Sequence, residues 1–150
     1  MKISSLKDLE KIANKIKKDI LPGDNLFLYG EIGVGKTTFS RLLINGLEKD
    51  YNLQQSEVPS PTFNIVFEYE INNMVIKHYD LYRIQKKEDI INLGIFANKD
   101  KDITLIEWPE LLEIMPNDRI NLYFEYSKNM ESRKLTIKGS GRFKDYDFEK

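Results

Sequence analysis

A glycine-rich segment from Gly30 to Thr37 constrains the fold more than any other part of the sequence. It reads Gly-Glu-Ile-Gly-Val-Gly-Lys-Thr and fits the Walker A pattern G-x-x-x-x-G-K-T without a mismatch. The apolar run Leu26 to Tyr29 before it is too short for a helix, and residues 38–47 after it have apolar residues at helical spacing. A strand, a glycine loop and a helix in this order are typical of a loop that wraps around phosphate groups. The segment therefore predicts nucleotide binding.

The residues of this loop have separate roles in phosphate binding. Glycines let the backbone approach the phosphates closely, and successive amides together with the positive end of the following helix stabilise the anion. Lys36 adds a mobile cation, Thr37 offers a hydroxyl to magnesium, and Thr38 is placed to hydrogen-bond the α-phosphate. The alternative is a glycine-rich turn that matches the pattern by chance, which the strand before it and the helix after it disfavour.

Length and composition bound the class of protein. A chain of 150 residues with 41% hydrophobic content fits one α/β domain over residues 1–150. Its formal net charge of -1 offers no polycationic surface, so tight direct binding of RNA is not expected. The absence of cysteine excludes disulfides, thiolate zinc sites and cysteine nucleophiles. Residues 1–9 lack the apolar core of a signal peptide, and no apolar run approaches the roughly 20 residues that cross a bilayer. We expect a cytoplasmic protein with no membrane role.

The rest of the sequence alternates between helical and extended patterns. Ser5 and Asp8 form a capping box, and the apolar positions of the helix that follows recur as far as Ile20, before Pro22 and Gly23 break the pattern. Strands are predicted at residues 63–69 and 74–79 around an Asn-Asn turn, at 103–106, at 119–126 and at 133–138, with a helix at 86–96. These elements favour a P-loop NTPase-like three-layer α/β fold, with a mixed or mostly parallel central sheet and helices on both faces. The polar tail from about residue 140 to 150 is expected to fray.

A second chemical signal is the strand from Ile103 to Ile106, which ends at Glu107. This is the place where P-loop folds put the acid that faces magnesium. Magnesium that arrives with a nucleotide keeps several waters, so one hydroxyl and one or two carboxylates suffice as protein ligands. The alternative is that Glu107 merely ends a strand in solvent.

A third signal is weaker. The segment from His78 to Arg83 reads His-Tyr-Asp-Leu-Tyr-Arg and puts Asp80 just past the second hairpin strand. His78 is the only histidine, so a zinc site with several histidines is excluded, and a structural role for a lone histidine is the commoner case. Asp80 and Arg83 could form a surface pair. Ser60-Pro61-Thr62 could be only a turn, although its hydroxyls would suit a mobile loop near a γ-phosphate.

Taken together, these motifs resemble the TsaE family of P-loop ATPases in tRNA threonylcarbamoyladenosine biosynthesis, over nearly the whole chain. The loop alone is generic, but four motifs in this order are specific. They are residues 30–38, residues 60–63, residues 78–83, and Leu105-Ile106-Glu107-Trp108-Pro109-Glu110. The departures are minor, since Tyr79 stands where phenylalanine is common and Val34 where alanine is common.

The resemblance implies a set of site residues. It assigns magnesium to Thr37 and Glu107, with Asp80 as an acid near the metal, and it implies catalytic roles for Glu107, Asp80 and Lys36. Trp108 matches a tryptophan beside the nucleotide. ATP or ADP binding is implied for Gly33, Val34, Gly35, Lys36, Thr37 and Thr38, and Ser132 with Arg133 align with a C-terminal strand that approaches the nucleotide.

The resemblance also implies a function and partners. Family members look like ATP-binding proteins with weak, partner-dependent ATPase activity, which act with the proteins TsaB and TsaD to modify tRNA adenosine next to the anticodon. TsaD performs the threonylcarbamoyl transfer, so contact with tRNA would be only indirect, through the complex.

Three other classes of protein are alternatives to this family. A small GTPase would need a guanine-reading N-K-x-D, whereas Asn98-Lys99-Asp100-Lys101 ends in lysine. A small-molecule kinase of the P-loop class would need an acceptor pocket and usually an arginine-bearing lid, and the five arginines are not clustered in the sequence. A nonenzymatic assembly module that merely holds ATP stays open at this point.

Overall fold

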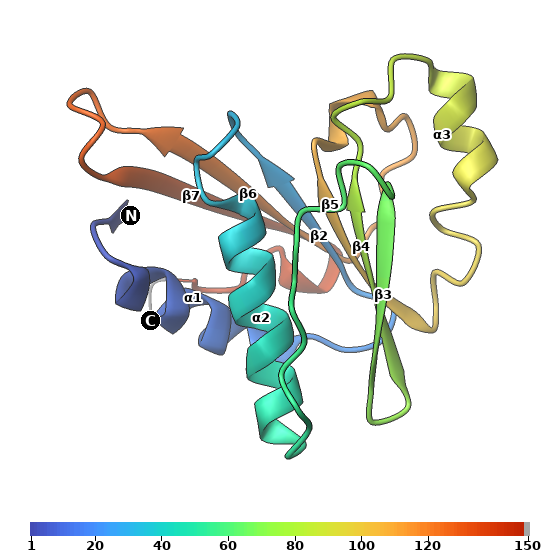
Figure 1. Cartoon of the computed structure of the whole chain (residues 1–150), viewed down its shortest axis with the longest axis horizontal. Coiled ribbons are helices and arrows are strands. Elements are labelled where there is room, and N and C mark those ends of the chain that lie inside the picture. Colours follow the sequence, from blue (N-terminus) through green and yellow to red (C-terminus); the bar gives the residue numbers. More distant parts are fainter. Residues whose placement is uncertain (149–150) are drawn as a thin grey trace.

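One seven-stranded sheet runs through this computed structural model, which describes residues 1–148 (Figure 1). The strands in chain order are β1 (Lys2–Ile3), β2 (Asn25–Tyr29), β3 (Val66–Ile71), β4 (Met74–Asp80), β5 (Asp102–Glu107), β6 (Arg119–Tyr126) and β7 (Arg133–Ser140). The helices are α1 (Leu6–Asp19), α2 (Lys36–Asp50) and α3 (Lys87–Leu93), with the short 3-10 helices η1 (Pro109–Leu111) and η2 (Gly141–Phe143). In the sheet the strands lie in the order β1-β7-β6-β2-β5-β4-β3.

The sheet is mixed, which confirms the predicted α/β class. The central strand β2 pairs in parallel with both β5 and β6, and β4 pairs in parallel with β5. The two sides of the sheet are antiparallel, formed by β3 with β4 and by β7 with β6 and β1. The carboxyl ends of β2, β4 and β5 therefore meet at one edge of the sheet, where ligands bind in open α/β folds.

Helices cover both faces of the sheet, and the side chains of β2 explain why. Leu26 and Leu28 pack into a core cluster with α1 and α2, whereas Phe27, between them, packs into a second cluster with Ile90 of α3. This alternation follows from the two-residue period of a strand. In Figure 1, α2 crosses in front of the sheet and α3 lies at the opposite end from β7.

The helix boundaries have local causes. The predicted capping box at the start of α1 is present, since the Ser5 hydroxyl accepts from the Asp8 amide at 3.3 Å and the Asp8 carboxylate accepts from the Ser5 amide at 3.0 Å. The helix predicted at 86–96 is shorter in the structure, because Gly94 adopts a left-handed conformation with φ of 57° and ends it.

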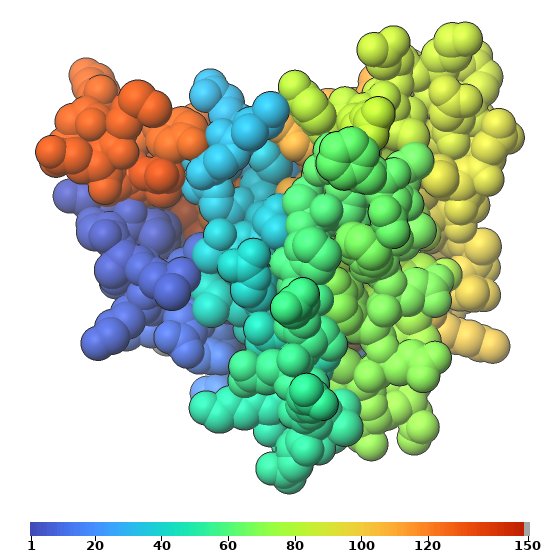
Figure 2. Space-filling view, viewed as in Figure 1, coloured from blue at the N-terminus to red at the C-terminus, as the bar shows by residue number. Residues whose placement is uncertain are grey.

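The hairpin of β3 and β4 turns at Asn72 and Asn73, as predicted. Both have positive φ, 45° and 66°, which suits a tight hairpin turn. The prediction that the first strand begins at residue 63 was wrong, because the Ile65 amide bonds back to the Pro61 carbonyl and residues 62–64 form a turn. Before this turn, residues 52–60 run along the surface beside α2 (Figure 2), where the Arg41 guanidinium donates to the Val58 carbonyl at 3.4 Å.

The first residues of the predicted polar tail, 140–143, lie in the regular elements β7 and η2. β7 continues to Ser140, and the side chain of Phe143 is 1% exposed within the core cluster under α1 and α2. Arg142 holds the tail to the body of the protein through its Nε, which donates to Asp24 Oδ1 at 2.8 Å. Residues 149 and 150 of the predicted tail lie outside the described residues. None of the helices within residues 1–148 combines the length and the apolar character of a membrane-spanning segment.

Candidate functional site

The glycine loop connects the end of β2 to the start of α2, as predicted. Gly30 has φ of 138°, and a Cβ there would stand 2.5 Å from the carbonyl oxygen of Phe124, so the loop fits against β6 only with glycine at this position. Gly35 has φ of 123° and is the N-cap residue of α2 without a side-chain cap. Among the described residues, no atom outside the immediate chain neighbours of Gly35 lies within 4 Å of a Cβ built there, so the space beside the first turn of α2 is open to a ligand.

A cavity of about 400 Å³ lies against this loop. It brings together the four motifs of the sequence, because the loop, the segment after residue 58 and the ends of β4 and β5 all reach it. The cavity is lined by Ile32, Gly33, Gly35, Lys36, Thr37, Thr38, Ser60, Thr62, Asp80, Tyr82, Glu107 and Trp108.

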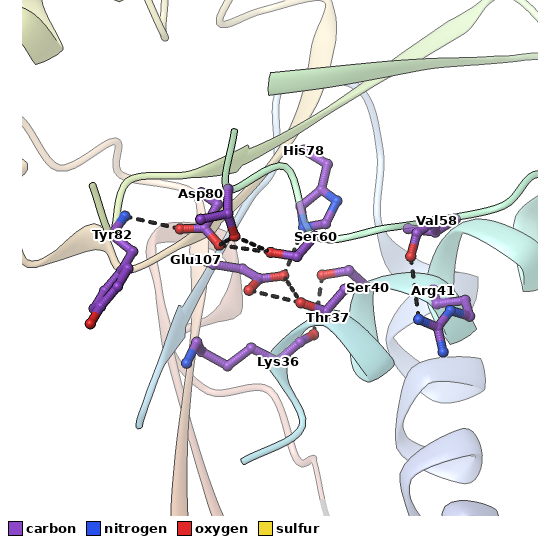
Figure 3. A network of polar contacts seen from close by, with 11 residues as sticks. Lys36, Thr37, Ser40, Arg41, Val58, Ser60, His78, Asp80, Tyr82 and Glu107 are labelled. Atoms are coloured by element: carbon purple, nitrogen blue, oxygen red, sulfur yellow. Dashed lines mark hydrogen bonds and ion pairs between the residues drawn. The ribbon is translucent and has the colours of Figure 1, made fainter. Parts of the chain in front are cut away.

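Thr37 and Glu107 form the centre of a polar network at this cavity (Figure 3). The Thr37 hydroxyl lies 2.9 Å from Glu107 Oε1 and 3.1 Å from Oε2, across the gap between the start of α2 and the end of β5. Glu107 is 2% exposed, so the alternative that it ends a strand in solvent is wrong. The imidazole Nε2 of His78 lies 2.8 Å from Glu107 Oε1.

Asp80 stands beside Glu107, because the two residues are paired in register at the ends of β4 and β5. Its carboxylate accepts hydrogen bonds from the hydroxyls of Ser60 at 2.9 Å and Thr62 at 3.3 Å, and from the Tyr82 amide at 2.9 Å. The Ser60–Thr62 segment is thus tied to the cavity through Asp80. The suggested surface pair of Asp80 with Arg83 is not formed; Asp80 is buried and the Arg83 guanidinium lies over the ring of Phe63.

Lys36 is folded back onto its own loop. Its ammonium group donates to the carbonyls of Gly30 and Glu31, the latter at 2.8 Å, and lies 4.3 Å from the centre of the Trp108 ring. Burial lowers the pKa of Lys36, and the neighbouring charges of Glu107 and Asp80 oppose that shift. A buried cation bonded to neutral carbonyls would gain from an anionic partner such as a phosphate.

Two aromatic residues complete the wall of the cavity. Trp108 has a left-handed backbone with φ of 59°, which turns the chain away from β5 and sets its ring against that of Tyr82, with 4.8 Å between the centroids. Trp108 was expected beside the nucleotide from the resemblance. The sequence analysis predicts no role for Tyr82, which also lines the cavity; its position two residues after Asp80 is the sequence signal that places it there.

Three predicted binding residues do not line this cavity. The Val34 side chain is buried in the core cluster, which leaves only its backbone for a ligand. Ser132 and Arg133 line a separate hollow near the N-terminus. The Arg133 guanidinium lies 4.4 Å from the centre of the Tyr126 ring, and the Tyr126 hydroxyl donates to the Ile32 carbonyl at 3.1 Å. Arg133 therefore reaches the glycine loop only through Tyr126.

The residues at the cavity fit a magnesium nucleotide. A hydroxyl and two adjacent carboxylates are hard oxygen donors of the kind that Mg²⁺ prefers, and the uncapped start of α2 suits phosphate. Among residues 1–148 no group of three or more His, Cys, Asp or Glu side chains could hold a metal ion. A metal at this site would accordingly take phosphate and water oxygens as its other ligands.

Fold and site together define an α/β protein with a phosphate-loop sequence at the carboxyl end of its central strand and two carboxylates on neighbouring strands. The family model described as "Threonylcarbamoyl adenosine biosynthesis protein TsaE" matches residues 3–135. The chain belongs to the TsaE family, which confirms the resemblance carried by its motifs.

Individual relatives agree with this assignment. The chain is 34% identical over 111 residues to the tRNA threonylcarbamoyladenosine biosynthesis protein TsaE of Rickettsia conorii, across 74% of this chain and 61% of that protein. It is 37% identical over 112 residues to the protein of the same name from Haemophilus influenzae, across 71% and 67% of the two chains. The match thus spans about three fifths of the length of the Rickettsia conorii relative. The fold is similar to that of Bacillus subtilis YdiB, with a TM-score of 0.72, 23% identity, and coverage of 97% of this chain and 87% of that one.

Proposed function

We propose that this chain is a cytoplasmic ATP-binding protein with weak, partner-dependent ATPase activity, which acts with TsaB and TsaD in the threonylcarbamoyl modification of tRNA adenosine next to the anticodon. The contact of Thr37 with Glu107 at the open start of α2 is the observation that best supports nucleotide binding. The partners and the tRNA step rest on membership of the TsaE family. A net charge of -1 agrees with contact to tRNA only through the complex.

The residues of the cavity have distinct roles in the proposed function. The backbone amides of residues 33–38 bind the phosphates, and Lys36 turns from its loop carbonyls toward them. The hydroxyl of Thr37 and the carboxylates of Glu107 and Asp80 face the magnesium ion or its waters, and Thr38 bonds the α-phosphate. Bound magnesium would neutralise charge on the transferred phosphoryl group. Trp108 would pack beside the nucleotide.

Nucleotide choice gives the first test. ATP and ADP are expected to bind with magnesium, while GTP competes poorly, because Lys101 stands where an N-K-x-D motif would have its guanine-reading aspartate. Isothermal titration calorimetry with each of the three nucleotides measures this directly. Equal affinities for GTP and ATP would contradict the proposed specificity.

Replacement of Lys36 gives the second test. Lys36→Ala should weaken ATP binding by about 1.5 to 3 kcal/mol, because it removes a charge-assisted contact to the phosphates. Lys49→Ala is the matched control, since Lys49 is exposed at the other end of the same helix. Titration calorimetry on both variants compares the two lysines. Wild-type affinity in Lys36→Ala would mean that the loop does not bind phosphate.

The partners can be tested separately from the nucleotide. The chain used as bait in a cell extract should recover TsaB and TsaD, identified by mass spectrometry. A small-molecule kinase would recover neither protein and would instead transfer phosphate to an acceptor. A nonenzymatic assembly module would recover both proteins but would show no ATP turnover when they are added.

A further inference from the structure

His78 is the only histidine of the chain, and it lies on β4 next to the candidate site. Its side chain is 0% exposed. The ring atom Nε2 lies 2.8 Å from Glu107 Oε1, whereas the other nitrogen, Nδ1, is buried without a hydrogen-bond partner among the described residues. Burying an unpaired polar atom is costly, so a purely structural role would be served better by an apolar side chain at this position.

The hydrogen bond has one direction. The Glu107 carboxylate also accepts from the Thr37 hydroxyl, and the oxygens of a carboxylate only accept hydrogen bonds. The proton between His78 and Glu107 therefore belongs to Nε2, which donates. Since Nδ1 has no partner, the whole hydrogen-bonding capacity of His78 is directed at this one carboxylate oxygen.

We propose that His78 is a positioning residue of the nucleotide site, whose Nε2–H holds Glu107 Oε1 so that Oε2 stays directed at the metal or its bound water. This inference rests on the proposed function, because it assigns a task to a residue behind Glu107.

Two donors on different elements fix the plane of the Glu107 carboxylate. Thr37, at the start of α2, has a single hydroxyl proton and lies within 3.1 Å of both carboxylate oxygens. This shared contact alone leaves the carboxylate free to turn about its last bond. The second donor, from His78 on β4, contacts one oxygen only and so distinguishes Oε1 from Oε2 (Figure 3). At 2% exposure, Glu107 has little access to water that could replace the imidazole.

The spacing of the motif follows from the strand. His78 and Asp80 are two residues apart on β4 and therefore point to the same face of the sheet, toward α2. Asp80 is paired in register with Glu107 on β5. One strand thus delivers both the second acid of the site and the donor that orients the first.

Two variants of equal length separate the donor from the bulk of the ring. His78→Gln places an amide nitrogen at the same number of bonds from the backbone as the imidazole Nε2, whereas His78→Met has the same length without a donor. The readout is the magnesium enhancement, defined as the ratio of the ADP dissociation constants measured by calorimetry without and with Mg²⁺. Thermal melting reports whether each variant is folded.

The expected result is a loss of the magnesium enhancement by about fivefold or more in His78→Met, with metal-free ADP affinity changed by less than about twofold. His78→Gln should retain more than about half of the enhancement. With TsaB and TsaD present, His78→Met should lower kcat for ATP by about tenfold while KM changes by less than about threefold, as expected when orientation rather than binding is lost.

Ile76→Val is the control for damage to the strand, because Ile76 is buried on the same face of β4, two residues before His78. It should leave the magnesium enhancement at its wild-type value. A folded His78→Met variant with the full magnesium enhancement overturns the proposal. A folded His78→Gln variant without the magnesium enhancement also overturns it. The His78→Gln result decides the question if His78→Met does not fold. If the wild-type chain binds ADP without any magnesium enhancement, the proposed metal site itself fails, and His78 has nothing to position.

Discussion

ATP hydrolysis by this chain alone is expected to be about 1,000-fold slower than hydrolysis in the presence of TsaB and TsaD. P-loop sites gain most of their rate from charge stabilisation of the transferred phosphoryl group, and an arginine that reaches this group is worth three orders of magnitude or more. Within residues 1–148, Lys36 is the only cationic residue that lines the cavity. The second cation would have to come from a partner.

The five arginines of the chain are all engaged elsewhere. Arg41 donates to the Val58 carbonyl, Arg83 lies over Phe63, Arg119 donates to the Pro116 carbonyl, Arg133 lies over Tyr126, and Arg142 pairs with Asp24. The sequence showed only that the arginines are not clustered along the chain; the structure also shows the contacts that each of them makes. They also weaken the alternative of a small-molecule kinase, because such an enzyme usually closes an arginine-bearing lid over its own site.

Release of inorganic phosphate measures this prediction, with the chain alone, with each partner, and with both. Arg83→Ala serves as the control, since Arg83 follows Tyr82, which lines the cavity, and is the arginine nearest to it along the chain. The variant should leave the slow rate of the isolated chain unchanged. Turnover by the chain alone at about 10 per second would show that the site is complete without partners.

The sequence predicted those features of the site that depend on motifs of consecutive residues. A strand, a glycine loop and a helix can be recognised in consecutive residues, and so can a carboxylate at the end of an apolar strand. Parallel strands place their carboxyl ends at the same edge of the sheet, so the meeting of Glu107 with Thr37 follows once both elements are recognised. The same rule brings Asp80 to Glu107.

The features that the sequence did not predict depend on contacts between distant segments. Tyr126 reaches Ile32 across 94 residues, and nothing in the residues around either one indicates the bond. The tail seemed to be solvated because its charged residues dominate the pattern, yet Phe143 and Tyr146 pack together with 5.9 Å between ring centroids. The spacing of the aromatic residues in the tail was a sequence signal for packing, but the many charged residues around them masked it. The two-residue strand β1 is too short for any periodicity.

The proposed role of His78 differs from the role that a lone histidine usually has. A lone histidine is more often structural than catalytic, and His78 touches no open space in the cavity. Its partner, however, is the acid of the site itself, at 2.8 Å. In the proposed role, His78 is buried like a core residue and would act on the chemistry through the carboxylate that it contacts.

Glu107→Gln is expected to lower ATP hydrolysis in the presence of TsaB and TsaD by about 100-fold or more, while nucleotide binding persists. The glutamine keeps the size of the side chain, and its amide can still accept from His78 and donate to the Thr37 hydroxyl, so the local fold should survive. What is lost is the negative charge that, in the proposed site, would face the metal and help to orient its bound water. The glycine loop and Lys36, the proposed phosphate-binding groups, are unchanged in this variant.

Three measurements together decide the role of Glu107. Calorimetry should show ADP bound by Glu107→Gln, phosphate release should show the loss of turnover, and tRNA modification over repeated cycles should fail with it. Asp80→Asn should behave similarly if both acids serve the metal. Glu110→Gln is the matched control, because Glu110 is exposed only three residues further along the chain, and it should retain the wild-type rate. Normal turnover and normal multi-cycle modification by Glu107→Gln would mean that this buried carboxylate braces α2 against β5 through Thr37 and takes no part in the chemistry.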